Sequence, residues 1–267
     1  AGASRSLYMD GNATIIAANK LLAAMRKEDG TLRTYDEMKA EGIETKYLGR
    51  YETNTTPGLC RLDPNTGIGD PTPAFTYCLN LAEVEVDTKT GKTTVLKFTC
   101  VDFVGRIGNI DAVNGQAYSG IMHGIGFALK EDYADVKKHA NMFGAGTSYI
   151  KDVPDDINLI HIDGAISDGP FGSSGASEAF QASGHCAVLN GIYNACGVRI
   201  HEIPALPEKV KAGLDAIAKG EKPYEPKKYF LGSDMYEELE NIKENPVQYD
   251  SYNFYQPLGD ADADRPF

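Results

Sequence analysis

The 267-residue sequence predicts an α+β fold, in which antiparallel β-hairpins pack against several helices. Residues 75–87 and 92–104 both alternate apolar and polar side chains around a short turn, which is the pattern of a hairpin. Residues 8–26 and 179–196 instead repeat apolar side chains at helical spacing. We expect two subdomains related by a faint internal repeat, with a boundary near residue 165.

The charge and the cysteine pattern exclude several classes of protein. A net charge of −12 argues against a nucleic-acid partner, because phosphate binding needs a basic surface. The five cysteines show no C-x-x-C spacing and the five histidines no H-x-x-x-H pattern, so we expect no metal site within the chain. No run is long and apolar enough for a membrane span, and the start does not resemble a signal peptide. We expect a cytoplasmic protein, with the periplasm as the alternative.

The first part of the chain is predicted to be mainly helical. After the helix at 8–26, a short helix begins at Thr34, with Glu37 three residues later in a capping-box pattern. Residues 46–53 are predicted to form a strand, and the proline-rich residues 54–73 a long loop.

The hairpin is the clearest local structure, and we interpret it as scaffold. Residues 88–91, with the sequence TKTG, supply its turn. Alternation of side chains predicts that the buried face includes Leu81, Val84, Val86, Val95, Phe98 and Val101.

A glycine-rich helix is predicted at 109–133. Its glycines resemble a dinucleotide-binding loop, but no strand directly precedes them, so we expect them to let the helix pack closely on another backbone. Gln116 is the polar exception, since its amide can donate and accept hydrogen bonds toward a heteroaromatic cofactor. A surface glutamine is the alternative. The glycines are Gly115, Gly120, Gly124 and Gly126.

Further elements are predicted after residue 156. They are a strand at 157–162, the helix at 179–196, a short strand at 198–203 and a helix near 207–218. Residues 219–267 are acidic and contain prolines, so we interpret them as a tail with one short acidic helix.

The chain therefore divides into three predicted parts. Residues 1–165 hold the N-terminal loop, the hairpin and the glycine-rich helix. Residues 166–218 hold a loop of small residues followed by the long helix, and residues 219–267 form the acidic tail.

The loop before the helix at 179–196 is the strongest candidate for a ligand site. Small residues let a ligand approach the backbone closely, and one carboxylate, Glu178, follows them. Glu178 is either a helix first-turn carboxylate with Ser177 as N-cap, or a general base at the floor of a cleft, where burial would raise its pKa. The loop residues placed to contact a ligand are Ser174, Gly175, Ala176 and Ser177.

A second loop of small residues opens the chain. It could face the same ligand, and the alternative is that Arg5 is only a solvated charge near the chain end. Its residues are Ala3, Ser4, Arg5 and Ser6.

The order of these segments resembles the C-terminal part of the molybdenum hydroxylase family, the xanthine dehydrogenase and aldehyde oxidoreductase group. The sequence contains, in the order typical of that family, GASRS, LAEVEVDTKTGKTTV, VNGQAYSGIMHGIGFALKEDY, GPFGSSGASE and NGIYNACGVRIHEIPALPEKV. The resemblance extends to about residue 230. It is nearest to bacterial aldehyde oxidoreductases that carry molybdopterin cytosine dinucleotide.

The resemblance implies the fold of a molybdopterin-binding domain of the aldehyde oxidase and xanthine dehydrogenase type. It places Glu178 beside molybdenum without ligating it, as the general base of a hydroxylation that takes its oxygen from water and converts aldehydes to carboxylic acids. By the same resemblance, residues 174–177 and 3–6 would hydrogen-bond the pterin or the dinucleotide, and Gln116 would contact the pterin.

Two positions depart from the family pattern. Ser177 stands where the family usually has glycine, and Ala176 where a larger aliphatic residue is commoner. The side chain at position 177 would narrow the substrate pocket or change the orientation of Glu178. Two alternatives to aldehyde oxidation therefore stay open. One is a hydroxylase of the same mechanism that acts on a purine or another N-heterocycle, and the other is a non-catalytic interaction domain that kept the fold.

The iron–sulfur domain and the upstream cofactor loops of the family do not occur in this sequence. We therefore expect a C-terminal fragment that is inactive alone, with iron–sulfur clusters in missing regions or partner subunits. The expected partners are the remainder of the molybdenum-binding chain, an iron–sulfur electron-transfer domain and a small-molecule substrate. The full enzyme is expected to form a homodimer, and neither nucleic acid nor membrane is expected as a partner.

Overall fold

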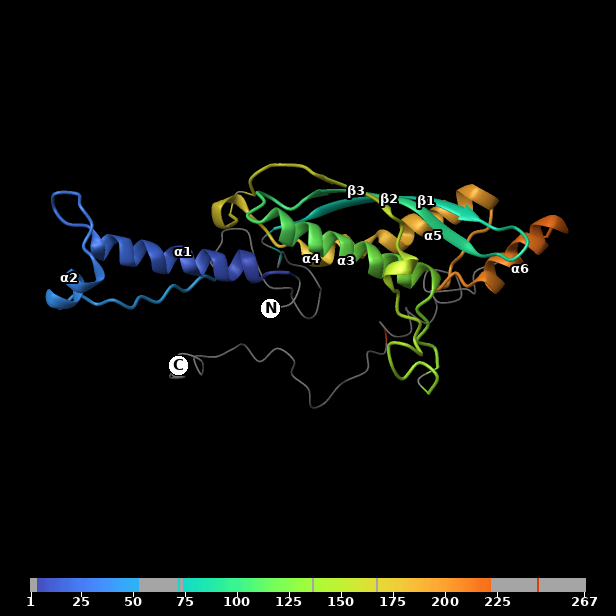
Figure 1. Cartoon of the computed structure of the whole chain (residues 1–267), viewed down its shortest axis with the longest axis horizontal. Helices are drawn as coiled ribbons and strands as arrows, with labels where there is room; N and C mark the ends of the chain where they lie inside the picture. Colours follow the sequence, from blue (N-terminus) through green and yellow to red (C-terminus); the bar gives the residue numbers. More distant parts are fainter. Residues whose placement is uncertain are drawn as a thin grey trace. The chain divides into compact units, whose positions relative to one another are not determined.

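The computed structural model describes residues 4–52, 72, 74–135, 137–166, 168–221 and 244. Ala1–Leu59 and Thr72–Tyr224 form one compact unit, and Cys60–Pro71 with Glu225–Phe267 form a second. Every element described below belongs to the first unit (Figure 1). The predicted loop at 54–73 and the acidic tail lie almost entirely outside the described residues. The division of the chain into three parts stays a prediction.

Two helices open the unit. α1, Ser6–Met25, begins two residues before the predicted start. α2, Tyr35–Ala40, has the predicted capping box, in which the Thr34 hydroxyl accepts from the Glu37 N–H and the Glu37 carboxylate accepts from the Thr34 N–H. Two orphan N–H groups at the start of α2 are thereby satisfied.

The sheet contains the predicted hairpin and one further strand. β1, Tyr77–Val86, pairs antiparallel with β2, Thr93–Phe103, and the Asp87 carboxylate accepts from Lys89 and Thr90 in the turn. β3, Asp156–His161, pairs parallel with β2, so the sheet is mixed and has the order β1-β2-β3. The α+β class is confirmed.

The predicted buried face of the hairpin is wrong for Leu81 and Val101, and a bulge in β2 explains why Val95 and Phe98 are both buried. Ala82 faces Phe98 and Val84 faces Val95, so Leu96 is an extra residue that reverses the alternation of β2. As a result Val95, Phe98 and Cys100 all face the core, whereas Val101 does not belong to it. Leu81 is 57% exposed, on the opposite face.

Four helices complete the unit. α4 and α5 replace the single helix predicted at 179–196, because the chain breaks at Ser183, whose hydroxyl accepts from the Asn80 amide at 2.8 Å. Helices α3, α4 and α5 cover one face of the sheet (Figure 1) and enclose a core centred on Phe98, Ile121 and Phe180. The four helices are α3, Ile110–Leu129; α4, Ser177–Ala182; α5, Gly184–Cys196; and α6, Pro207–Ala218.

Close packing on another backbone, predicted for all four glycines of α3, is confirmed for Gly120 and Gly124 and is wrong for Gly115, which faces open space. Gly120 lies against the Phe180 backbone and Gly124 against Gly184, where an added Cβ would come within 2.9 Å of the Gly184 Cα. We expect Gly124→Ala to lower the free energy of unfolding by about 1–3 kcal/mol, because the neighbouring backbone cannot move aside cheaply. A Cβ at Gly115 in the same helix would lie in open space, so Gly115→Ala should instead raise the free energy of unfolding, by up to about 1 kcal/mol. Urea unfolding of both variants would test this, and an equal response would contradict it.

Two predicted strands are absent from the described residues. Residues 46–52 lie along α1, with Gly49 against the backbone of Ala13 and the Leu48 carbonyl accepting from Lys20 at 2.9 Å. Residues 198–203 form an irregular connection, in which the buried Val198 packs with Ile192 and Val210 in a second core cluster. Neither segment meets a neighbouring strand, and without a partner an extended segment forms no ladder.

Candidate cofactor site

The loop of small residues is fixed to the end of β2. It begins with the short 3-10 helix η3, Pro170–Gly172, and then runs beside Gly105 and Arg106 in an isolated antiparallel bridge. Arg106 N–H donates to the Gly172 carbonyl at 2.8 Å, and the Ser173 hydroxyl donates to the Arg106 carbonyl at 2.6 Å. Backbone pairing with a buried sheet therefore holds a segment that small residues alone would leave free to move.

The N-terminal loop and the loop of small residues come together at Ser4. The hydroxyl groups of Ser4 and Ser177 lie 2.7 Å apart, and the Ser4 hydroxyl accepts from the Glu178 N–H at 3.0 Å. Ser4 thus caps α4 from a distant part of the chain. The prediction that Ser177 is the N-cap is wrong, because Ala176 occupies that position and Ser177 is the first residue of α4.

Gly175 makes this approach possible. A Cβ at Gly175 would overlap the carbonyl group of Ser4, whose carbonyl carbon would lie at 2.7 Å. The Gly175 carbonyl also accepts from the Thr76 hydroxyl at 2.8 Å, next to the start of β1. The loop is therefore held between the first residues described and the sheet.

Helix α1 supports the same loop from a third side. Gly11 lies against the ring of Pro170, and the Asn12 amide donates to the Asp168 carbonyl at 3.0 Å. Arg5 and Ser6, at the start of α1, are exposed, and Ala3 lies outside the described residues.

Glu178 lies in the first turn of α4, as predicted, and is exposed. The described residues do not bury its carboxylate, so the cleft expected by the base interpretation is not formed by them alone. Ser174 and Ser177 are partly buried beside it, whereas Ala176 packs against the main core.

Gln116 lies at the same end of the unit. The contacts of Gly120 with Phe180 and of Gly124 with Gly184 show that α3 runs parallel to α4 and α5 with a constant offset. One turn before Gly120, the exposed Gln116 is therefore level with Ala176. The geometry thus brings together the two loops and Glu178, whereas Gln116 shares only their level on the neighbouring helix.

The loop fits a ligand that accepts hydrogen bonds. Among the described residues, the backbone N–H groups of Gly175, Ala176 and Ser177 donate to no other backbone carbonyl. Successive backbone N–H groups next to a glycine can bind phosphate or oxo groups in other proteins. This property fits a pterin dinucleotide, which carries both carbonyl and phosphate acceptors.

A buried polar network beside the loop was not predicted. His161 Nδ1 lies 2.7 Å from Asp102 Oδ2, and its Nε2 lies 2.7 Å from Asn114 Oδ1. The network joins the ends of β2 and β3 to the start of α3, two residues before Gln116. The signal in the sequence was the charged Asp102 within the alternating core positions of β2, which the misassigned register concealed.

The network predicts a pH dependence of stability. Burial raises the pKa of the Asp102 carboxyl above its ordinary value, and the bond to His161 opposes this only in part. The folded protein therefore binds more protons than the unfolded chain between the two pKa values, and stability falls as pH rises through that window. Asparagine at position 102 can still accept a hydrogen bond from His161, so Asp102→Asn should remove this fall in stability with rising pH. Urea unfolding from pH 4 to 7 would test it, and parallel pH profiles for the two proteins would contradict it.

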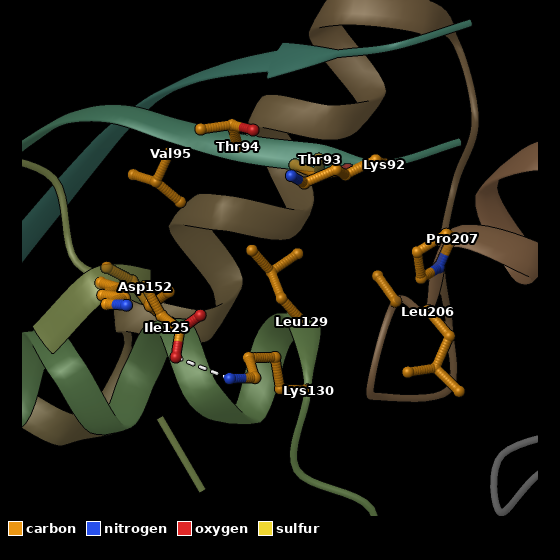
Figure 2. Close-up of a pocket in the computed structure, with 12 residues that line it drawn as sticks. Lys92, Thr93, Thr94, Val95, Ile125, Leu129, Lys130, Asp152, Leu206 and Pro207 are labelled. Atoms are coloured by element: carbon orange, nitrogen blue, oxygen red, sulfur yellow. Dashed lines mark hydrogen bonds and ion pairs between the residues drawn. The ribbon is translucent and has the colours of Figure 1, made fainter. Parts of the chain in front are cut away.

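A cavity of about 420 Å³ lies elsewhere in the unit (Figure 2). It is bounded by the start of β2, the end of α3 and the start of α6, with Leu129 and Leu206 in its wall. Lys130 pairs there with Asp152 at 2.6 Å. The loop of small residues lies beyond the opposite end of β2, so this cavity is not part of the cofactor site.

Comparison with known proteins identifies the family. Residues 1–154, more than half of the chain, match the model of the molybdopterin cofactor-binding domain. The chain belongs to this family. The resemblance to the molybdenum hydroxylases is thereby confirmed.

Relatives of this molybdopterin-binding chain are much longer. The aldehyde oxidoreductase of Megalodesulfovibrio gigas is 43% identical over 215 residues, which are 80% of this chain and 23% of that protein. The solved aldehyde oxidoreductase of Desulfovibrio gigas superimposes with a TM-score of 0.77 over 81% of this chain and 24% of its own, at 42% identity. A probable hypoxanthine oxidase of Escherichia coli is 30% identical over 55% of this chain and 16% of its own length. The chain thus spans about a quarter of the length of the aldehyde oxidoreductases.

No helix in the described part of the chain is long and apolar enough to cross a bilayer. The same residues hold no group of three or more His, Cys, Asp or Glu side chains placed to bind a metal ion.

Proposed function

We propose that this chain forms one wall of the cofactor site in a molybdenum-dependent hydroxylase that oxidises aldehydes to carboxylic acids. The observation that carries the proposal is the meeting of Ser4, Gly175 and Glu178 at one point of a chain that is 43% identical to an aldehyde oxidoreductase. The reaction adds one oxygen atom from water and removes two electrons and two protons.

The residues at the site have separate roles in this proposal. The unpaired N–H groups of residues 175–177 bind acceptor groups of the pterin or its cytosine dinucleotide, together with Ser174 and the loop at 3–6. Gln116 contacts the pterin through its amide. When bound, the cofactor supplies the two-electron redox chemistry.

Glu178 acts as the general base. Its carboxylate is exposed on the first turn of α4, and the Ser4 hydroxyl holds its backbone N–H, so the side chain starts from a fixed backbone position. The carboxylate takes the proton of the water-derived hydroxyl group as that group attacks the substrate carbon. The remainder of the enzyme would exclude water from this carboxylate.

A second candidate substrate class is a purine or another N-heterocycle. It is favoured by the identity of 30% to a probable hypoxanthine oxidase and by Ser177, whose side chain lies beside Glu178. A panel of aldehydes and N-heterocycles tested on the same purified enzyme separates the two classes. A non-catalytic domain would oxidise neither.

The proposed partners follow from the share of the relatives that the chain covers. They are the remainder of the molybdenum-binding polypeptide and an iron–sulfur electron-transfer domain, in a homodimeric enzyme of the cytoplasm. The electrons that leave the substrate pass through the iron–sulfur centres.

Purification from the native source tests the proposal. We expect this chain within a larger polypeptide or a tight complex, with about one molybdenum and one cytidine nucleotide per copy. Intact mass, metal analysis and chromatography of the released nucleotide measure these quantities. Purified protein without molybdenum would overturn the proposal and leave Glu178 as a first-turn carboxylate only.

A further inference from the structure

We propose that the uncovered face of the sheet docks an apolar layer from the remainder of the molybdenum enzyme, which there completes the cofactor site. This inference rests on the proposed function and adds the surface through which the two parts join. We call this surface the outer face. Its residues are Tyr77, Leu79, Leu81, Val101, Phe103 and Ile160.

The outer face is apolar in two neighbouring rows, whereas Leu81 pairs with Thr99, which pairs in turn with Asn158. Leu79 pairs with Val101, which pairs in turn with Ile160, so three strands contribute to one row. Tyr77 pairs with Phe103 in the next row, with ring centroids 6.3 Å apart. Because residues that pair across strands point to the same side of a sheet, these side chains are neighbours.

Among the described residues, Gly164 lies against the ring of Phe103, whereas most of the other side chains of this surface are exposed. Tyr77 is 64% exposed, Leu79 63% and Ile160 44%, whereas Phe98 and Cys100 on the other face are fully buried beneath the helices. Sheets with apolar side chains on both faces are normally covered on both. Contiguous apolar patches of this kind mark interaction sites in soluble proteins.

The outer face ends where the cofactor site begins. Thr76, directly before Tyr77, donates to Gly175, and Val104, directly after β2, accepts from the Ser174 N–H at 3.1 Å. A polypeptide lying on the outer face therefore reaches the loop of small residues. It can supply the second wall that Glu178 lacks in this chain.

Two observations favour the remainder of the enzyme over a second copy of this chain. The related aldehyde oxidoreductases contain about three-quarters of their length outside the region matched here. The cofactor site that borders the outer face also needs covering groups that this chain does not provide.

The opposite end of the same face is charged, which limits the docking surface. Glu83 and Glu85 continue β1 beyond Leu81 and are exposed, and Lys97 pairs with Asp156 at 3.2 Å. This end provides matched positions on the same strand and the same face that should stay in contact with water.

Hydroxyl-radical footprinting of the complete protein from its native source tests the proposal. Oxidation of Tyr77, Leu79 and Leu81 is compared with its rate in the same protein unfolded in urea, so that each residue is its own reference. We expect these rates to fall by about tenfold or more on folding, since an interface core excludes water. Oxidation at the three residues at close to their unfolded rates would overturn the proposal.

Variants in the complete protein separate docking from folding. We expect Leu79→Glu to restore oxidation at Tyr77 and to weaken assembly, and Glu83→Ala to change neither. If these three residues were protected from oxidation in a particle that contains only copies of this chain, a second copy would cover the outer face, and the proposal would be overturned. The molybdenum content of the same sample distinguishes the two hypotheses, because protection without molybdenum would reject the proposed function and keep the docking surface.

Discussion

Glu178→Gln in the complete enzyme is expected to lower kcat by about 10²–10⁴-fold while molybdenum stays bound. Glutamine keeps the size of the side chain and its place on α4, but it cannot take a proton. The Ser4 bond to the backbone N–H of residue 178 does not involve the side chain, so the loop should keep its structure. Steady-state kinetics and metal analysis of the same preparation measure both quantities.

A matched control distinguishes a base from a first-turn carboxylate. Glu208 occupies the first turn of α6, so Glu208→Gln makes the same chemical change at the same place in another helix. Both variants lose a favourable interaction with the helix dipole, of about 0.3–1 kcal/mol. If the two variants retained equal turnover, Glu178 would be no catalytic base.

Gly175→Ala is expected to reduce the molybdenum content of the purified enzyme by about tenfold or more, because the loop that it displaces would hold the cofactor. The added methyl group would overlap the Ser4 carbonyl, so Ser4 must move away from Ser177 and Glu178. The strain costs about 1–3 kcal/mol of stability, which most folded proteins survive.

Gly108→Ala is the control for this prediction. A Cβ at Gly108 meets open space, so the variant should keep both its molybdenum and its stability. Metal analysis, release of the nucleotide and thermal unfolding of the two variants are compared. A Gly175→Ala enzyme with its full content of molybdenum would show that the contact with Ser4 does not shape the cofactor site.

Local signals in the sequence predicted much of the fold. The capping box at Thr34 and Glu37 and the TKTG turn of the hairpin act within a few residues, so their physical cause is fully contained in the sequence pattern. The close packing at Gly120 and Gly124 was predictable because a helix interior disfavours glycine unless the missing side chain is needed.

Features that depend on a distant partner could not be predicted from pattern alone. The bulge at Leu96 could be found only from the pairing of β1 with β2, and it brings Val95 and Phe98 to the same face, whereas Leu81 and Val101 alternate with the buried Ala82 and Cys100 and therefore lie on the outer face. The strands predicted at 46–53 and 198–203 had suitable residues but no neighbouring strand in the described structure.

The candidate site, too, was predicted in part, and the rest was found only in the structure. Glu178 and the loop of small residues were visible as a segment, and their approach to the N-terminal loop was expected through the family resemblance. Two features of the site were not predicted, because each joins residues that lie far apart in the chain. They are the cap that Ser4 supplies and the network of Asp102, His161 and Asn114.

The cap from Ser4 also sets an order of events during synthesis. Ser4 and the Glu178 N–H that it holds are 174 residues apart, so this contact cannot form until the chain has been synthesised through residue 178. The entropy of closing so long a loop is recovered only when the sheet and α3 have already brought the ends close. The loop at Ser4 can therefore take its final place only after the segment that it caps, 174 residues later in the chain, has been made.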